Sequence, residues 1–308
     1  IYSFKVEKEE NEINIQDIIK VGIISIKMPI NDIKEDKYPI FYSYSDLAKN
    51  IKYAKNNGAQ YLLMPEFCIP LKHTIKVVNY CIKKKISLVV GLRHVILGKR
   101  GLNFTLIYDS KIKIALLKLK NYYPYAEKLI LAERFVLPGV PELPYYIRID
   151  NGLCQYSTMT CYEATNIKDR AFLNGKINLL FMPVYNRDTE YFSNIIGSLA
   201  RDISSFIIQA NNSEYGDSRI TGPMDSLHKD IVKIKGGENC FTVVGTLNLK
   251  KMQEKKEFME EINNKIYDLC TKPSTDIISE IEKINHEIEE NKKANEFKPL
   301  SAGNDKKK

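Results

Sequence analysis

Three short motifs in this 308-residue chain carry side chains that could together perform nucleophilic chemistry. Cys161 follows "STMT", Glu66 follows "YLLMP", and Lys118 and Lys120 lie at the end of "KIKIALLKLK". A thiol attacks a carbonyl or nitrile carbon well only as the thiolate, so it needs a base to take its proton and a cation to favour the charge. Acyl transfer also needs hydrogen-bond donors for the oxyanion. A carboxylate and a lysine can meet these needs.

The four histidines of the chain make a cysteine–histidine pair a second option. None of them falls at the end of a predicted strand beside Cys161. We interpret His73 and His94 as surface or packing residues, and we expect His286 on the polar side of a helix near the C-terminus. The carboxylate–lysine arrangement is therefore the more specific one.

The elements that must position these residues are predicted to alternate between strand and helix. The apolar runs "VGIISIKM", "AQYLLMPEF", "ISLVVGL" and "INLLFMPVY" are typical of buried strands. The segments "SYSDLAKNIKYAKNNG", "HTIKVVNYCIKKK" and "FSNIIGSLARDISS" have the helical period, and "NFTLIYDSKIKIALLKLK" is typical of a strand pair that turns near Asp109. This alternation predicts an α/β layered fold.

The carboxyl ends of strands are where such folds usually place their chemistry. Glu66, Cys161 and the Tyr185–Asn186 pair all fall at the ends of predicted strands, with "CQYSTMTCYE" taken as one strand that runs through the cysteine. Their common placement is the first reason to consider these residues together.

Composition indicates a soluble globular protein. Hydrophobic residues make up 44% and charged residues 27% of the chain, and no run approaches the roughly 20 apolar residues of a transmembrane helix. The net charge of +8 could favour nucleic acid, but the lysine runs are better explained as solvated surface. Six cysteines show neither metal-type pairing nor the density of a disulfide scaffold, so we expect reduced thiols, a cytoplasmic location, and no metal or other cofactor.

The composition changes from about Lys250, where two charged helices are predicted on either side of Lys272-Pro273. We therefore divide the chain into a linker or N-terminal extension (1–20), a main domain (21–249), a helical extension (250–298) and a disordered tail (299–308). Each helix has an apolar stripe that fits either packing on the main domain or a hairpin for oligomerisation. The stripes are Met259, Ile262, Ile266 and Leu269, and Ile277, Ile281, Ile284 and Ile288.

The three motifs occur in an order and in local contexts that resemble the nitrilase superfamily of carbon–nitrogen hydrolases. The resemblance covers about residues 21–249, and "INLLFMPVYN" and "ARDISSFIIQANNSEYGDSRITGP" extend it. It implies an α-β-β-α sandwich, here with a charged helical extension at the C-terminus. By the same resemblance Cys161 is the nucleophile, Glu66 is the general base, and the backbone N–H of Tyr162 is an oxyanion donor.

The resemblance also implies a lysine that stabilises the oxyanion and a second glutamate. Lys118 and Lys120 would face the same side of a strand with a period of two, so the pattern leaves both open. We prefer Lys118 because the preceding hairpin then follows the family register without a gap. The second glutamate is expected to be Glu127, with Glu133 as its substitute. Burial would raise the pKa of a carboxylate in this pocket.

Tyr185, Asn186 and Arg187 are expected to contact the substrate, because they follow the strand after the cysteine motif. The segment "CYEATN" lacks the Asp-x-Arg of many amidase-type members and looks closer to the Cys-Tyr-Glu of the N-acyltransferase branch. The substrate is therefore expected to be a small-molecule amide or nitrile, of a class that the residues leave open.

Two hypotheses from different classes follow. The first is a thiol amidohydrolase that forms an acyl-thioester on Cys161. The second is a nitrilase-like assembly module that forms a homo-oligomer or holds a fused or associated nucleic-acid enzyme. Such modules are found fused to ammonia-using synthetases and to reverse transcriptases of phage-defence systems.

Overall fold

The computed structural model describes residues 2–5, 17–28, 30, 33, 44–237, 240–271 and 277–294. The chain divides into two compact units, residues 1–251 and 252–308, and the division falls two residues after the predicted end of the main domain. The first unit contains the three sequence motifs.

A six-stranded sheet forms one layer of the first unit. Three of its neighbouring strands, β2, β3 and β4, are parallel, and the antiparallel hairpin β7–β8 extends it at one edge. In spatial order the strands are β16 (Phe241–Asn248), β2 (Ile18–Ser25), β3 (Tyr61–Ile69), β4 (Ser87–Leu92), β7 (Phe104–Asp109) and β8 (Ile114–Leu119).

A seven-stranded sheet forms the second layer. Its centre is the parallel set β11, β12 and β13. In spatial order the strands are β1 (Tyr2–Lys5), β10 (Ile147–Asp150), β11 (Gln155–Thr158), β12 (Leu179–Pro183), β13 (Phe206–Ala210), β14 (Ser218–Thr221) and β15 (Asp230–Ile234). A small third sheet consists of β5 (Val95–Leu97), β6 (Arg100–Leu102) and β9 (Leu137–Gly139).

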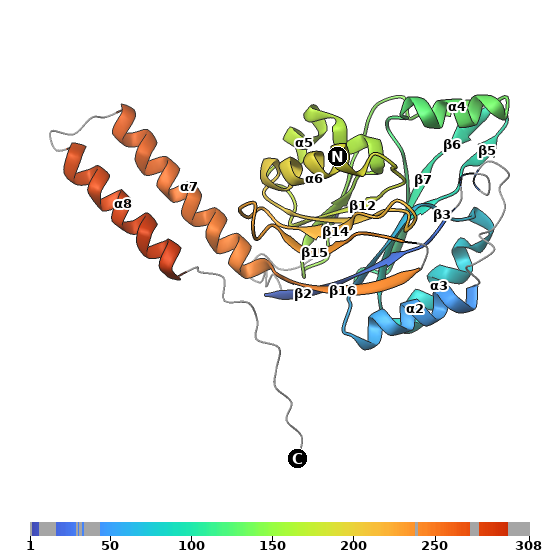
Figure 1. The fold of residues 1–308 in the computed structure, drawn as a ribbon, viewed down its shortest axis with the longest axis horizontal. Coiled ribbons are helices and arrows are strands. Elements are labelled where there is room, and N and C mark those ends of the chain that lie inside the picture. The colour runs from blue at the N-terminus through green and yellow to red at the C-terminus, as the bar shows by residue number, and fades with distance from the viewer. Residues whose placement is uncertain are drawn as a thin grey trace, which may run out of the picture. The chain divides into compact units, whose positions relative to one another are not determined.

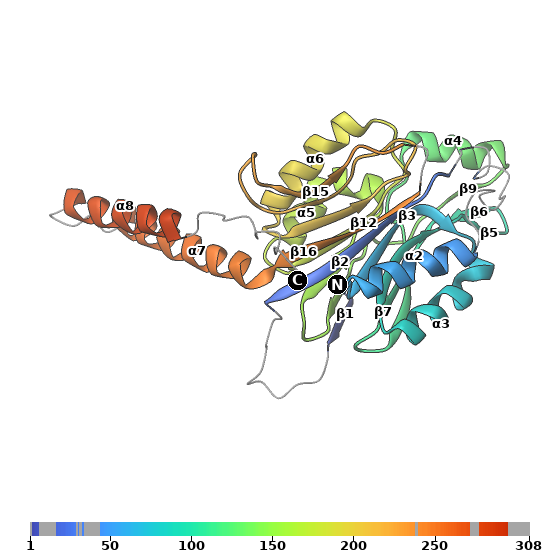
Figure 2. The same cartoon turned by 60° about the horizontal axis from the view of Figure 1, so that its bottom comes forward.

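Helices cover the outer face of each large sheet (Figures 1 and 2). α2 (Tyr44–Asn56) and α3 (Thr74–Lys84) lie on the six-stranded sheet, whereas α5 (Ile167–Leu173) and α6 (Thr189–Asp202) lie on the seven-stranded sheet. The apolar faces of these helices fix this arrangement, because Leu47, Ile51 and Ala54 of α2 are buried against strand side chains. The predicted α-β-β-α sandwich is confirmed.

Aromatic side chains fill the space between the two sheets. Tyr61 of β3 contacts Tyr156 of β11 and Phe181 of β12, with ring centroids 5.6 and 5.8 Å apart. Near the opposite ends of these strands, the Glu66 backbone N–H donates to the Val184 carbonyl at 3.4 Å. The carboxyl ends of β3 and β12 therefore meet at one edge of the sandwich.

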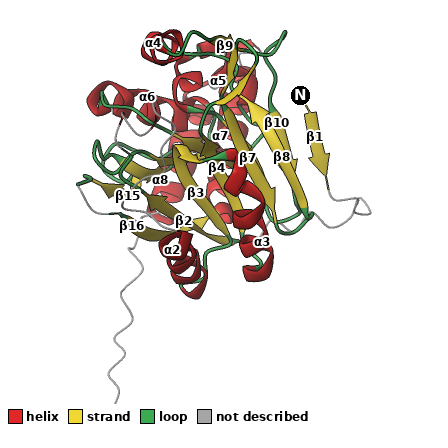
Figure 3. Cartoon of the chain, turned by 90° about the vertical axis from the view of Figure 1, so that its right-hand side faces the viewer, coloured by secondary structure: helices red, strands yellow, loops and turns green. Residues whose placement is uncertain are grey.

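Two segments differ from their predicted structure. Residues 2–5, within the predicted linker or N-terminal extension, form an edge strand that pairs in parallel with β10 (Figure 3), and residues 6–16 lie outside the described residues. The strand before the cysteine, β11, ends at Thr158, and Cys161 begins the 3-10 helix η2 (Cys161–Thr165). The turn forms because the Glu163 carboxylate accepts the Thr160 backbone N–H at 2.6 Å, which caps the helix and stops the strand.

The second unit contains most of α7 (Leu249–Thr271) and α8 (Ile277–Ala294). Ile262 of α7 and Ile284 of α8 are buried, and Lys265 pairs with Glu287 across the two helices at 2.6 Å. Other members of the predicted stripes stay exposed, namely Met259, Ile266, Ile277 and Ile281. The predicted break at Lys272-Pro273 and the predicted tail 299–308 lie outside the described residues. No described helix is both long and apolar enough to span a membrane.

Candidate active site

Glu66 lies within β3, where the strand bends away from its neighbour. The pairing of β3 with β4 shifts register between Met64 and Ile69, and Phe67 has a φ of +59°. Gly91 of β4 makes this bend possible, because a Cβ at position 91 would lie 2.4 Å from the Glu66 Cα. The bend turns the buried Glu66 carboxylate to the strand ends.

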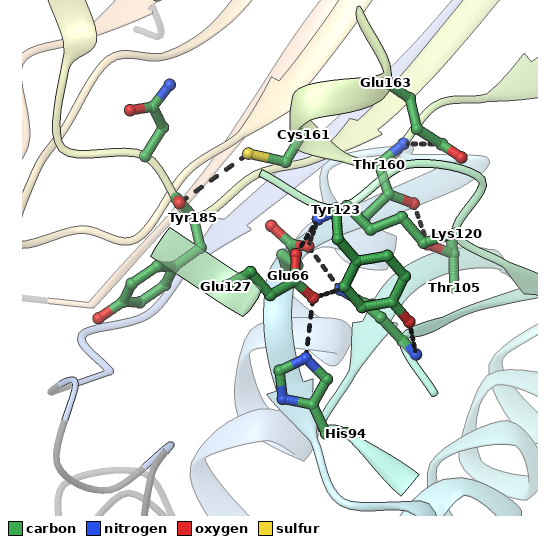
Figure 4. Close-up of polar contacts among 12 residues, drawn as sticks. Glu66, His94, Thr105, Lys120, Tyr123, Glu127, Thr160, Cys161, Glu163 and Tyr185 are labelled. Carbon is green, nitrogen blue, oxygen red and sulfur yellow. Dashed lines mark hydrogen bonds and ion pairs between the residues drawn. The ribbon is translucent and has the colours of Figure 1, made fainter. Parts of the chain in front are cut away.

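Lys120, and not Lys118, is the lysine beside Glu66 (Figure 4). Its Nζ lies 2.6 Å from Glu66 Oε1 and 2.6 Å from Glu127 Oε2, and all three side chains are buried. The prediction of Lys118 at this place is wrong: its Nζ pairs instead with Glu163, at 2.8 and 2.9 Å. Lys118 lies in β8 and Lys120 directly follows its last residue, so the choice depends on which carboxylate other elements bring to each of them.

Glu127, on α4 (Tyr125–Glu133), is surrounded by hydrogen-bond donors. Its Oε1 lies 2.7 Å from Asn103 Nδ2 and 2.8 Å from His94 Nε2. Asn103 also donates to Glu66 Oε1 at 2.8 Å, so one amide group bridges the two carboxylates. The suggested substitute Glu133 is exposed on the same helix.

Asn103 and His94 are the members of this group that sequence reasoning missed. His94 is buried, packs against the Phe67 ring at 4.8 Å and lies at the candidate site, which adds a polar contact to its predicted packing role. The available signal was its place just after β4, near a strand end. Asn103 also lies near a strand end, because it directly precedes β7. The first residue of β7, Phe104, pairs with the last residue of β8, Leu119, so Asn103 lies beside Lys120.

Cys161 begins η2 with a left-handed backbone, at a φ of +46°. Residues other than glycine rarely adopt this conformation, and here it places the side chain at a sharp turn between β11 and η2. Cys161 as a whole is 6% exposed, and its Sγ lies 3.9 Å from the Tyr185 carbonyl oxygen. The backbone of the loop after β12 therefore borders the sulfur.

The electrostatics of the site keep the thiol neutral and make Glu66 a better base. Burial raises the pKa of Cys161, the Glu66 charge raises it further, and the Lys120 charge lowers it. Burial also raises the pKa of Glu66 against the opposing effect of Lys120. Burial opposes the ionisation of Glu127 too, but Lys120 and His94 outweigh it and lower its pKa to about 2. The charges of Lys120 and Glu66 thus both act on the sulfur.

The loop after β12 holds the predicted substrate contacts. The Tyr185 ring packs against Phe67 and Tyr215, with centroids 5.6 and 5.3 Å apart. Asn186 is held at its backbone by Asn211, which accepts the Asn186 N–H and donates to its carbonyl, each at 2.9 Å. Arg187 is exposed, and Tyr162, beside the cysteine, is 43% exposed.

An open cavity of 600 Å³ lies between α6 and the β14–β15 edge. Tyr215 lines it and also contacts Tyr185, so the cavity borders the loop that approaches Cys161. Within the described ranges, no group of three or more His, Cys, Asp or Glu side chains could hold a metal ion.

No protein-family model and no curated protein matches the chain. Solved structures do match. An amidase from Nesterenkonia sp. aligns with a TM-score of 0.55 at 15% identity, over 79% of this chain and 95% of the amidase. The C. elegans NitFhit protein aligns with a TM-score of 0.62 at 14% identity, over 80% of this chain and 65% of NitFhit.

A mutant of the Nesterenkonia AN1 amidase, which belongs to the nitrilase superfamily, also aligns, with a TM-score of 0.55 at 15% identity. The alignment covers 79% of this chain and 96% of the chain of the amidase mutant. At these identities the likeness concerns the fold. The chain therefore has the fold of the nitrilase superfamily, as its three motifs predicted.

Proposed function

We propose that the protein is a thiol amidohydrolase, in which Cys161 forms an acyl-thioester with a small amide. The observation that carries this proposal is the placement of Lys120, at 2.6 Å from both Glu66 and Glu127, where its charge also acts on Cys161. A base, a cation and a thiol at one edge of the sandwich are the groups that this reaction requires.

In the first half-reaction, Glu66 takes the Cys161 proton and the thiolate attacks the amide carbon. The carbonyl oxygen becomes an oxyanion, which accepts hydrogen bonds from Lys120 Nζ and the Tyr162 backbone N–H. The tetrahedral intermediate then breaks its C–N bond, and the leaving nitrogen receives the proton from Glu66. The products are the acyl-thioester and ammonia or an amine.

In the second half-reaction, Glu66 takes a proton from water and the hydroxide attacks the thioester carbon. The same two donors stabilise the second oxyanion. The C–S bond breaks, the carboxylic acid is released, and the proton returns from Glu66 to the sulfur. Glu127 and Asn103 do not touch the reacting atoms in this scheme, but they hold Lys120 and Glu66 in place through both steps.

The choice of first substrates is supported by the matched amidase. The Nesterenkonia enzyme has been solved as a mutant with butyramide, and with the acetamide moiety of fluoroacetamide added covalently at its active site cysteine. The nearly enclosed thiol of this chain also favours a small acyl group. We therefore expect short aliphatic amides to be turned over.

The test is mass spectrometry of the intact protein after incubation with fluoroacetamide. Because Cys270 is an exposed free thiol, the protein used carries Cys270→Ala; in this background we expect an adduct that is absent in Cys161→Ala and retained in Cys154→Ala, which removes a different buried thiol. Undiminished labelling of Cys161→Ala would refute the assignment. Release of ammonia from butyramide by the wild-type protein, and not by Cys161→Ala, would establish turnover.

A second candidate function, homo-oligomeric assembly or the holding of a nucleic-acid enzyme, is favoured by apolar side chains on the second unit. Those exposed on α7 and α8 include Met259, Ile266, Ile278 and Ile281. Light scattering of the full chain tests assembly: we expect an oligomer that Ile266→Glu with Ile281→Glu dissociates and the exposed-site control Lys255→Glu does not. A monomeric wild type argues against it.

A further inference from the structure

Lys118 and Glu163 form a second buried ion pair next to the candidate active site. Both side chains are 0% exposed. Lys118 Nζ donates to both carboxylate oxygens of Glu163, at 2.8 and 2.9 Å, and its third contact is the Leu119 carbonyl at 3.5 Å. All three N–H groups of this ammonium are thus directed at fixed protein oxygens. The pair therefore finds its partners within the protein and has no exposed surface.

The same carboxylate accepts two backbone N–H groups, one from each catalytic segment. Glu163 Oε1 accepts from Asn121, the residue after Lys120, at 2.6 Å. Glu163 Oε2 accepts from Thr160, the residue before Cys161, at 2.6 Å. One side chain therefore connects the backbone beside the oxyanion lysine to the backbone beside the nucleophile.

Both segments need such a connection. β8 ends at Leu119, so Lys120 lies beyond the strand. The last backbone contact on this side is the hydrogen bond that the Lys120 N–H donates to the Asn103 carbonyl, and no strand pairing with β7 holds the chain after it. Cys161 has a left-handed backbone, and conformations of this kind persist only where the surroundings hold them. The Glu163 carboxylate provides that hold at both places.

The ionised form of the carboxylate is what allows it to serve four donors. A glutamine at the same place would turn one N–H₂ group toward a backbone N–H, so one of the two segments would lose its acceptor. A buried carboxylate in turn needs a compensating cation, because an unpaired charge in the protein interior is strongly destabilising. Lys118 provides that cation.

We propose that Lys118 and Glu163 are a positioning pair, which sets the placement of Lys120 relative to Cys161 without touching the substrate. The hydrolytic consequence rests on the proposed function, whereas the effect on the reactivity of the Cys161 thiol does not. In this proposal Lys118 positions the catalytic residues and takes no part in the reaction itself.

The test compares Lys118→Met, Glu163→Gln and the double variant with the wild-type protein. Tyr156→Phe is the matched control, because it removes a buried hydrogen bond to Asp109, at the opposite end of the β7–β8 hairpin. Three quantities are measured for each: the melting temperature, kcat and KM for butyramide, and the rate of Cys161 alkylation by iodoacetamide as a function of pH.

We expect each single variant to melt well below the wild type, because each leaves a buried group without its partner. The double variant carries no unpaired charge, so its melting temperature should lie closer to that of the wild type than to those of the single variants. Its kcat should nevertheless stay about 10- to 100-fold low with little change in KM, since a shift of about 1 Å has such effects. The pH dependence of Cys161 alkylation in the double variant should be shifted relative to that of the wild type.

Wild-type kcat and a wild-type alkylation profile in the double variant would overturn the proposal. So would an equal loss of kcat in Tyr156→Phe at an equal melting temperature, because the effect would then be general destabilisation. If the wild type hydrolyses no amide while the double variant still shows a displaced alkylation profile, the positioning role stands and the proposed hydrolase fails.

Discussion

Replacing Lys120 by methionine is the substitution that most directly tests the candidate site. Methionine has nearly the length of lysine but no charge and no donors, so Glu66 and Glu127 lose the cation that lies 2.6 Å from each. Asn103 still bridges the two carboxylates, and His94 still contacts Glu127. The change therefore isolates the lysine charge within an otherwise intact group.

The expected loss of activity has two parts. Removal of one oxyanion donor typically lowers kcat by about 10²–10³. The base is lost as well, because burial and Glu127 already raise the pKa of Glu66 and only Lys120 and hydrogen bonds oppose them. Without Lys120, Glu66 takes up a proton and cannot deprotonate Cys161. We expect kcat for butyramide to fall more than 10³-fold in Lys120→Met, taking the two effects together.

The stability lost in Lys120→Met should depend on pH, because the substitution changes the pKa of Glu66. Breaking a buried ion pair costs roughly 3–5 kcal/mol when the partner keeps its charge, and less where the partner can take up a proton. In Lys120→Met the pKa of Glu66 lies further above its unfolded value, so the folded state binds more protons. The free energy of unfolding should then fall as pH rises from the unfolded pKa through the folded one. We expect the difference in melting temperature from wild type to grow between pH 5 and pH 8.

The comparison with Lys118→Met decides which lysine serves the oxyanion. Lys118→Met removes a positioning group, so its kcat should fall by less than that of Lys120→Met. The reasoning is refuted if Lys120→Met keeps most of its activity, or if Lys118→Met is the more damaged of two variants that both fold.

Substitutions at three further positions probe the groups around this lysine. Asn103→Leu should lower kcat about 10- to 100-fold, because it removes the donor shared by two carboxylates, and circular dichroism should show the fold retained. His94→Gln should keep more activity than His94→Leu at pH 7, since only glutamine can still donate to Glu127; equal kcat values would contradict this. Gly91→Ala should cost about 1–3 kcal/mol in urea unfolding, because its Cβ meets the Glu66 backbone at 2.4 Å; an unchanged midpoint would contradict this.

The sequence predicts the layers of this fold well because its strands are continuous apolar runs and its helices have one apolar face. Glu66 could be chosen for the same reason, since it follows such a run. Cys161 follows the more polar "CQYSTMT" and could be chosen only through the resemblance of its motif, read together with the glutamate and lysine motifs. β11 was extended too far, because the sequence pattern does not show that the Glu163 side chain caps the turn at Cys161. Local periodicity describes strands better than it describes side chains that return to the backbone.

The choice between Lys118 and Lys120 could not be made from a period of two. The two lysines are two residues apart at the end of β8. Their partners Glu66 and Glu163 come from β3 and η2, 54 and 45 residues away, and only Glu127 is near in the sequence, seven residues after Lys120. His94 was missed in the same way, because its partner Glu127 lies 33 residues later on a helix. Pairings between separate elements require the assembled sheets.

The two buried lysines differ in what remains for a substrate. Lys118 directs its three N–H groups at Glu163 and Leu119, so it has no donor left to give. Lys120 makes two hydrogen bonds among the described residues, one to each of its carboxylates, and a third N–H remains for an oxyanion. From the described residues, Glu66 accepts two hydrogen bonds, both on Oε1, which leaves Oε2 for a proton from the thiol or from water. We therefore assign the chemistry to Lys120 and Glu66, because each keeps a hydrogen-bonding atom for the reaction. Lys118 keeps none.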